Sequence, residues 1–101
     1  SFKPLPKFPA SERDVAMLVA ESVTHSEVLA VVTKAKADNL VDTQLFDVFR
    51  GQNVPGGQKS LAYSFTYRST EKTLTDEEVN GAHELLVMSF KEQLGATIRD
   101  N

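Results

Sequence analysis

The segment KSLAYSFTYR, residues 59–68, shows the clearest alternation of side chains in the chain. Its odd-numbered positions from Leu61 to Tyr67 carry leucine and aromatic side chains, whereas its even-numbered positions carry small or polar ones. Successive side chains of a β-strand point to opposite faces of a sheet. The segment therefore predicts a strand with one apolar, buried face and one polar face.

The segment that precedes it predicts the partner of this strand. Residues 40–50, LVDTQLFDVFR, alternate poorly at first and strongly from Leu45 onward, with aromatic and β-branched side chains typical of strands. Residues 51–57, GQNVPGG, are expected to connect the two strands into a hairpin. We expect their glycines to serve turns that need a positive φ, and an anion-binding nest is the alternative.

Two helix starts are marked by capping-box spacing. Thr24 precedes Glu27, and Thr75 precedes Glu78, by three residues, and each pair is followed by an apolar stripe of helical period. The first helix is expected from Thr24 to about residue 37. The second is expected from Thr75 to a stop at Gly95.

Two further short strands are predicted, at residues 15–20 and 96–99, from their apolar character. The resulting order is βαββαβ. This order is typical of an α+β, ferredoxin-like fold, in which a four-stranded antiparallel sheet carries two helices on one face. The other face of such a sheet is open to a partner.

The composition bounds the size of the protein and the chemistry open to it. A chain of 101 residues predicts one domain with one modest core. The start, SFKPLPKFP, holds three of the four prolines, so residues 1–9 are expected to form an extended connector from a preceding domain and residues 10–101 the domain itself. The absence of cysteine excludes disulfides and is compatible with a cytoplasmic location. No apolar run approaches the roughly 20 residues that span a bilayer, so no membrane partner is expected.

Signatures of catalysis are missing as well. His25 and His83 are the only histidines, and neither the H-E-x-x-H nor the G-x-x-x-x-G-K-[ST] pattern occurs. Arg13 lies near the first strand, but no phosphate-binding loop of the acylphosphatase kind follows it. We therefore expect no catalytic residue, no metal site and no cofactor in this chain.

The polar face of the predicted hairpin carries the most informative group of residues. Alternation places Asp47 and Phe49 on the open side of the sheet, opposite Ser60 and Arg68. In such a group the aromatic ring can stack on a base, the carboxylate can accept hydrogen bonds from a guanine edge, and cations can meet phosphates.

The same alternation places Phe46 and Val48 on the side that the helices cover. From the pattern alone, an ordinary mixed sheet surface, or a face packed on another domain, is the commoner explanation of the open side. The net charge of −3 excludes a bulk electrostatic attraction to nucleic acid. Any RNA contact must then depend on local residues.

Five blocks of the sequence resemble one known family. They are KFPASERD at residues 7–14, LFDVFRG at 45–51, KSLA at 59–62, KTLTDEEV at 72–79 and the short last strand at 95–100. In content, order and spacing they are similar to the ferredoxin-fold anticodon-binding domain at the C-terminus of bacterial phenylalanyl-tRNA synthetase beta subunits. The resemblance covers nearly all of residues 7–100.

The resemblance implies a function and a set of site residues. The family domain binds the anticodon stem-loop of phenylalanine tRNA, chiefly its first anticodon base, a guanine. Asp47 and Ser60 match the family residues associated with that base, and Phe49 matches the neighbouring aromatic residue, which is often tyrosine in the family. Arg68 and Arg13 complete the predicted RNA-binding set as cations for phosphates.

The resemblance also implies a parent enzyme. This would be a class II phenylalanine–tRNA ligase, an α2β2 heterotetramer that uses ATP, Mg²⁺ and L-phenylalanine, with its catalytic site in the alpha subunit. The present domain would be non-catalytic, with the anticodon stem-loop, the rest of the beta subunit and the alpha subunit as partners. The alternative is a ferredoxin-like interaction or regulatory domain that packs its sheet on protein and binds no RNA.

Overall fold

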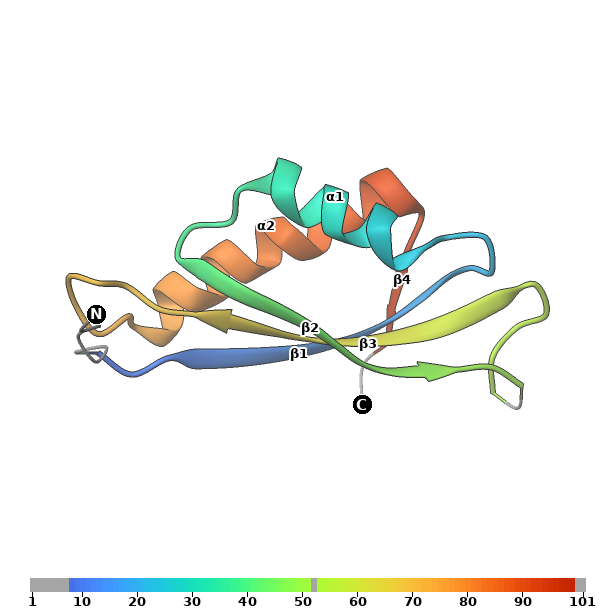
Figure 1. The fold of residues 1–101 in the computed structure, drawn as a ribbon, viewed down its shortest axis with the longest axis horizontal. Helices are drawn as coiled ribbons and strands as arrows, with labels where there is room; N and C mark the ends of the chain where they lie inside the picture. The colour runs from blue at the N-terminus through green and yellow to red at the C-terminus, as the bar shows by residue number, and fades with distance from the viewer. Residues whose placement is uncertain (1–7, 52, 100–101) are drawn as a thin grey trace, which may run out of the picture.

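The computed structural model describes residues 8–51 and 53–99, so the predicted connector at residues 1–9 lies outside the described residues except for its last two positions. The elements in chain order are β1 (Ser11–Ala20), α1 (His25–Ala35), β2 (Leu40–Phe49), β3 (Gln58–Tyr67), α2 (Asp76–Leu94) and β4 (Thr97–Arg99). The strands pair antiparallel in the order β2-β3-β1-β4. Both helices lie on one face of this sheet and leave the other uncovered (Figure 1). The predicted ferredoxin-like βαββαβ fold is confirmed.

Both helices begin at the predicted caps. The side chain of Thr24 accepts a hydrogen bond from the Glu27 amide at 3.1 Å. Thr75 and Glu78 form a reciprocal capping box, each side chain accepting from the other residue's amide at 3.1 Å. Gly95 ends α2 in the left-handed region, at φ +64°, which glycine adopts without steric cost. Of the helices described, none is both long enough and apolar enough to cross a bilayer.

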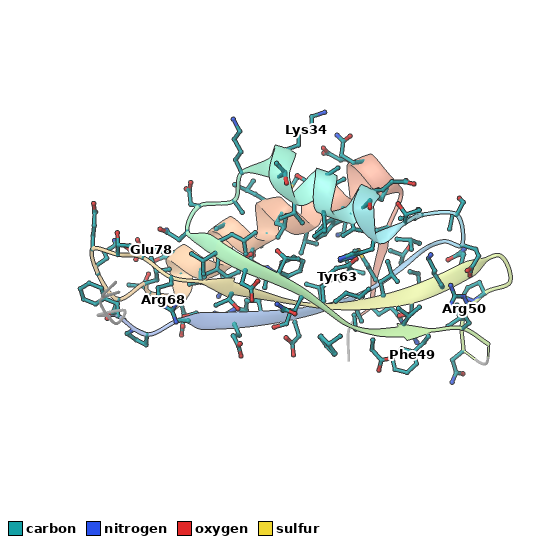
Figure 2. The ribbon with its side chains drawn as sticks, in the orientation of Figure 1. Lys34, Phe49, Arg50, Tyr63, Arg68 and Glu78 are labelled. Atoms are coloured by element: carbon teal, nitrogen blue, oxygen red, sulfur yellow. The ribbon has the colours of Figure 1, made fainter. Side chains whose placement is uncertain are left out.

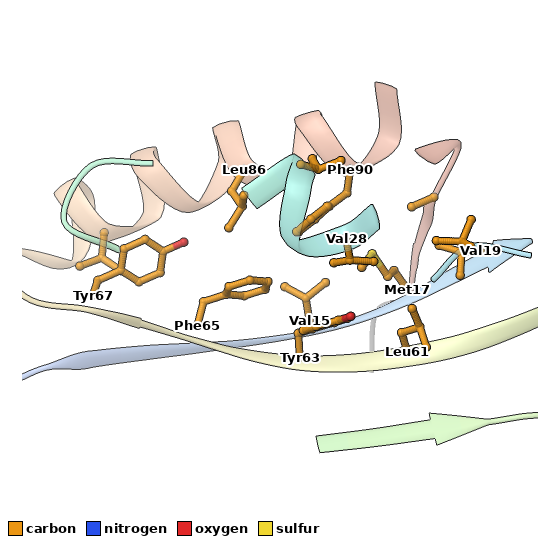
Figure 3. Packing of buried hydrophobic residues seen from close by; sticks show 14 of the residues in the cluster. Val15, Met17, Val19, Val28, Leu61, Tyr63, Phe65, Tyr67, Leu86 and Phe90 are labelled. Atoms are coloured by element: carbon orange, nitrogen blue, oxygen red, sulfur yellow. The ribbon is translucent and has the colours of Figure 1, made fainter. Parts of the chain in front are cut away.

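The apolar face of β3 lies at the centre of the core. Figure 3 shows the rings of Tyr63, Phe65 and Tyr67 projecting from this strand toward the side of the two helices. The largest fully buried apolar side chains of the core come from β1, β3 and both helices: Met17, Val19, Val28, Tyr63, Phe65, Tyr67, Val79, Leu86 and Phe90. The regular alternation that defined this strand in the sequence thus also defines the side of the sheet that the helices cover.

β1 begins four residues earlier than the predicted strand. Its first half pairs with β3, with Ser11 opposite Tyr67 and Arg13 opposite Phe65. The charged side chains of this half hide the strand in the sequence, because a run of apolar side chains is the pattern that predicts a buried strand.

The loop between β2 and β3 is built from turns. The Val54 amide donates to the Gly51 carbonyl at 3.1 Å, and the Gln58 amide donates to the Pro55 carbonyl at 3.1 Å. Gly51 and Gly57 have positive φ values, +95° and +79°. These features favour the turn explanation of the glycines over an anion-binding nest.

β2 departs from regular alternation at two β-bulges. Its register against β3 shifts between Leu40 and Asp42 and again between Leu45 and Asp47, so Val41 and Phe46 are the extra residues. A bulge places two residues opposite one and redirects a side chain. The prediction that Phe46 faces the helices is therefore wrong, since its side chain is 58% exposed and lines a hollow on the open face.

The prediction that Val48 lies on the side covered by the helices is confirmed only in part. Val48 lies opposite the buried Leu61, on the helix side, yet it is 38% exposed. β2 is an edge strand of the sheet, and the end of its hairpin extends past the helices (Figure 1). No helix is therefore available to cover this position.

Candidate nucleic-acid interface

The hairpin brings three of the predicted residues together on the open face. Phe49 lies directly opposite Ser60, and Asp47 lies opposite Ala62. Residues paired in this way have Cβ atoms about 4.5–5.5 Å apart. Phe49 is 52% exposed and points away from the helices, whereas Tyr63 points toward them (Figure 2). Asp47, Phe49 and Ser60 therefore form one group near the β2–β3 loop.

Ser60 lies deeper than the sequence suggested. The register places it between Phe49 on β2 and Leu18 on β1, and it is only 1% exposed. It lines a hollow of about 320 Å³ together with Phe49 and Arg50. A ligand would have to enter this hollow to reach the Ser60 hydroxyl.

Asp47 is oriented by its own strand. Its Oδ1 atom accepts a hydrogen bond from the Val48 amide at 2.9 Å, and Asp42 beside the other bulge holds the Thr43 amide in the same way at 2.9 Å. No hydrogen bond joins the Oδ2 atom of Asp47 to the described residues. One carboxylate oxygen of Asp47 thus fixes its rotamer, while the other can accept a hydrogen bond from a ligand.

A larger hollow of about 510 Å³ adjoins the first on the open face. Its walls include Phe46, Asp47 and Phe49 from β2, together with Asp14 from β1 and Arg99 from β4. Arg99 and Phe49 line both hollows. The two hollows are therefore neighbouring parts of one surface, which we call the open-face site.

Phe46, Asp14 and Arg99 were absent from the predicted set. Asp14 pairs with Ser64, so counting alternate residues along a correctly bounded β1 places it on the open face. Arg99 pairs with Ala16 in a strand of only three residues, which carries too little pattern to fix its face. A bulge has no compositional signal, so the position of Phe46 was not accessible from the sequence.

Arg13, a predicted RNA contact, lies on the opposite side of the sheet from this site. Its Nε donates to Asn80 Oδ1 at 3.0 Å, and its guanidinium lies 3.8 Å from the Asp76 carboxylate. Both partners belong to the first two turns of α2. The side chain therefore ties β1 to α2 and stays apart from Phe49.

Arg68 directly follows β3, at the other end of the sheet. Eight residues of extended chain separate it from Ser60, a span of about 27 Å. Figure 2 shows Arg68 and Phe49 near opposite ends of the hairpin. The Nε atom of Arg68 is buried without a hydrogen-bond partner among the described residues. A ligand on the open-face site would reach Arg68 only if it extended along the whole sheet.

Arg50 brings a cation to the edge of the site, but an acidic partner holds it. Its Nη2 atom lies 2.6 Å from Oε1 of Glu21, and its Nε donates to the same carboxylate at 2.8 Å. The hydrogen bond from Arg50 lowers the pKa of Glu21, and the same bond raises the pKa of Arg50. The positive charge of Arg50 is thus partly balanced at the protein surface.

Comparisons with a protein family and with individual relatives agree with each other. The chain matches the ferredoxin-fold anticodon binding domain family over residues 6–99. It is 44%, 43% and 45% identical, over 98 residues, to the phenylalanine–tRNA ligase beta subunits of Lactiplantibacillus plantarum, Clostridium tetani and Moorella thermoacetica. Each match covers 97% of this chain, and the chain spans about 12% of the length of each relative.

Proposed function

Since the chain belongs to the ferredoxin-fold anticodon-binding domain family, we propose that it binds the anticodon stem-loop of phenylalanine tRNA through the open-face site. Its similarity to phenylalanine–tRNA ligase beta subunits supports a place in such a subunit. There it would support aminoacylation in the cytoplasm without carrying the catalytic site. The rest of the beta subunit and the alpha subunit of the heterotetramer would be its protein partners.

The observation that carries this proposal is the group formed by Phe49, Asp47 and Ser60. An exposed ring offers a stacking surface that any base can use, worth about 1–3 kcal/mol per base. The Oδ2 atom of Asp47 can accept from the N–H groups of a guanine edge, and the Ser60 hydroxyl lies at the floor of the adjoining hollow. Such contacts identify a base, whereas phosphate contacts would only position the loop.

The charged residues near the open-face site predict only a modest electrostatic attraction to RNA. Glu21 partly balances Arg50, and Asp14 and Asp47 line the same hollow as Arg99. We therefore expect the affinity of the isolated domain to depend more on stacking and base contacts than on phosphate neutralisation.

ATP and Mg²⁺ belong in this proposal to the catalytic part of the parent ligase. The described residues hold no group of three or more histidine, aspartate or glutamate side chains positioned to bind a metal ion.

A second candidate function is a protein-interaction domain that binds no RNA. The exposed Phe46 and Phe49 rings and the burial of Ser60 favour it, because a protein surface could cover these rings as well as a base could. The net charge of −3 is compatible with this alternative too.

A chemical-shift titration of the isotopically labelled domain separates the two candidates. The ligand is a phenylalanine-tRNA anticodon stem-loop, and the matched ligand has cytidine in place of guanosine at the first anticodon position. We expect shifts centred on Asp47, Phe49 and Ser60 that weaken with the cytidine loop. An absence of shifts at millimolar loop, or shifts indifferent to the exchanged base, would contradict the proposal and favour the protein-interaction candidate.

A further inference from the structure

The second bulge of β2 leaves a large aromatic side chain in an unusual position. Phe46 is the extra residue between Leu45 and Asp47, and it is 58% exposed on the face that the helices leave open. A phenylalanine ring gains about 1.5–3 kcal/mol from full burial, so its exposure on the uncovered face is not explained by folding. The ring is therefore available to a partner on this face.

The position of Phe46 relative to Phe49 suggests that role. The two residues are three positions apart along β2, about 10 Å of extended chain. Both rings line the hollow of about 510 Å³, and both are more than half exposed. The charged residues that line this hollow are Asp14, Asp47 and Arg99. Two aromatic side chains on one sheet face can each stack a splayed-out base of single-stranded RNA.

We propose that Phe46 stacks a second unpaired nucleobase, so that the open-face site holds two neighbouring nucleotides of the RNA loop. This inference depends on the proposed function, because Phe49 is taken to stack the first anticodon base. The chemistry of the walls favours a base with an exocyclic amino group, since Asp14 can accept hydrogen bonds from it and Arg99 can donate to its ring nitrogens or carbonyl oxygens.

The other bulge of β2 provides an internal control. Val41 is its extra residue and is 56% exposed, close to the exposure of Phe46. It lines a different hollow, beside Leu29 and Val32 of α1, and it has no ring to stack. Removing its side chain perturbs the same strand by the same kind of change without touching the open-face site.

The test combines protein variants with altered stem-loops in binding titrations. The protein variants are Phe46→Ala, Phe46→Tyr and Val41→Ala. The altered stem-loops have an abasic nucleotide immediately before or immediately after the first anticodon base. We expect Phe46→Ala to weaken binding of the intact loop about 5- to 150-fold, the equivalent of one stacked base. Phe46→Tyr keeps the ring and should bind the intact loop as tightly as the unaltered domain does. Val41→Ala should also leave the affinity unchanged.

The decisive result is the coupling between the variant and one abasic loop. Phe46→Ala should have no further effect on the loop that lacks the stacked base and should retain its full effect on the other. If Phe49→Ala weakens binding of the stem-loops but Phe46→Ala leaves the affinity for all of them unchanged, the site holds one base. That result overturns this inference and leaves the proposed function intact. If Phe46→Ala weakens all loops equally, Phe46 does not stack either neighbouring base, and the inference is again wrong. If the unaltered domain binds none of them, the proposed function fails, and this inference fails with it.

Discussion

The two faces of one sheet use aromatic side chains in opposite ways. On the helix side of β3, Tyr63, Phe65 and Tyr67 are fully buried, whereas on the open side of β2, Phe46 and Phe49 are more than half exposed. The buried rings lie on a strand with unbroken alternation, and the exposed rings lie on an edge strand with two bulges. The comparison separates residues that hold the domain together from residues that are available to a partner.

The buried face also contains two tyrosine hydroxyls, and each has a hydrogen-bond partner. The Tyr63 hydroxyl lies 2.8 Å from Nδ1 of His25, and the Tyr67 hydroxyl lies 2.8 Å from Nδ1 of His83. Burial raises the pKa of both tyrosines to about 12, because an ionised phenol would be poorly solvated there. The tyrosines therefore remain neutral at any physiological pH and serve the core as apolar bodies with one satisfied hydroxyl.

The largest expected difference between the faces is in folding. Phe65→Ala should lower the free energy of unfolding by about 3–5 kcal/mol, because it leaves a cavity beneath α2. Phe49→Ala removes the same ring from a half-exposed position and should change that free energy by no more than about 0.5 kcal/mol. Urea denaturation followed by circular dichroism measures both. Equal destabilisation by the two variants would mean that Phe49 is part of the core.

The reverse difference is expected in RNA binding. Phe49→Ala should weaken binding of the anticodon stem-loop by about 1–3 kcal/mol, through the loss of one stack. Asp47→Ala should reduce the preference for guanosine over cytidine at the first anticodon position. Met88, which is 51% exposed on α2, gives a control of matched exposure, and Met88→Ala should leave binding unchanged. Unchanged binding by the Phe49 and Asp47 variants would remove the site assignment.

The sequence predicted the regular part of this comparison and missed the irregular part. Alternation along residues 59–68 gave the buried face of β3 directly, and the capping boxes placed both helix starts. An inserted bulge residue changes no composition, so the exposure of Phe46 could not be inferred. Arg13 belongs to the predicted RNA-binding set as a cation for phosphates, and the predicted strand at residues 15–20 did not include it. Alternation from Ser11 places it with Val15, on the helix side.

A smaller effect is expected from the hydrogen bond between Tyr67 and His83. Burial, and next the charge of Arg13, lower the pKa of His83, whereas Glu84 acts in the opposite direction. The unfolded chain therefore binds a proton more readily, and stability should fall as the pH decreases below the ordinary value of 6.5. Tyr67→Phe removes this hydrogen bond and should lower the free energy of unfolding by about 0.5–1.5 kcal/mol at neutral pH. His83→Asn should flatten the acid side of the pH dependence of the melting temperature, and an unchanged slope would show that His83 does not cause it.

The smallest expected effect lies outside both faces, at the exposed start of α2. A hydrogen bond from Lys72, at 2.6 Å, and another from the Thr75 amide hold the pKa of Glu78 at about 2, below its ordinary value of 4.5. As the pH falls, the Glu78 carboxylate is protonated at a lower pH in the folded state than in the unfolded state. Its contribution to stability is therefore complete above pH 4.5 and disappears as the pH falls through about 2.

Glu78→Gln keeps an oxygen for the capping box and removes the charge. Its melting temperature should lie slightly below that of the unaltered domain at pH 7, and the two should converge as the pH approaches 2. Glu77→Gln, in the same helical turn but outside the capping box, supplies the control for net charge. Because α2 covers only the apolar face of the sheet, Glu78→Gln should shift the melting curve without changing the affinity for the stem-loop. A parallel loss of RNA binding would show that the two faces are coupled through α2.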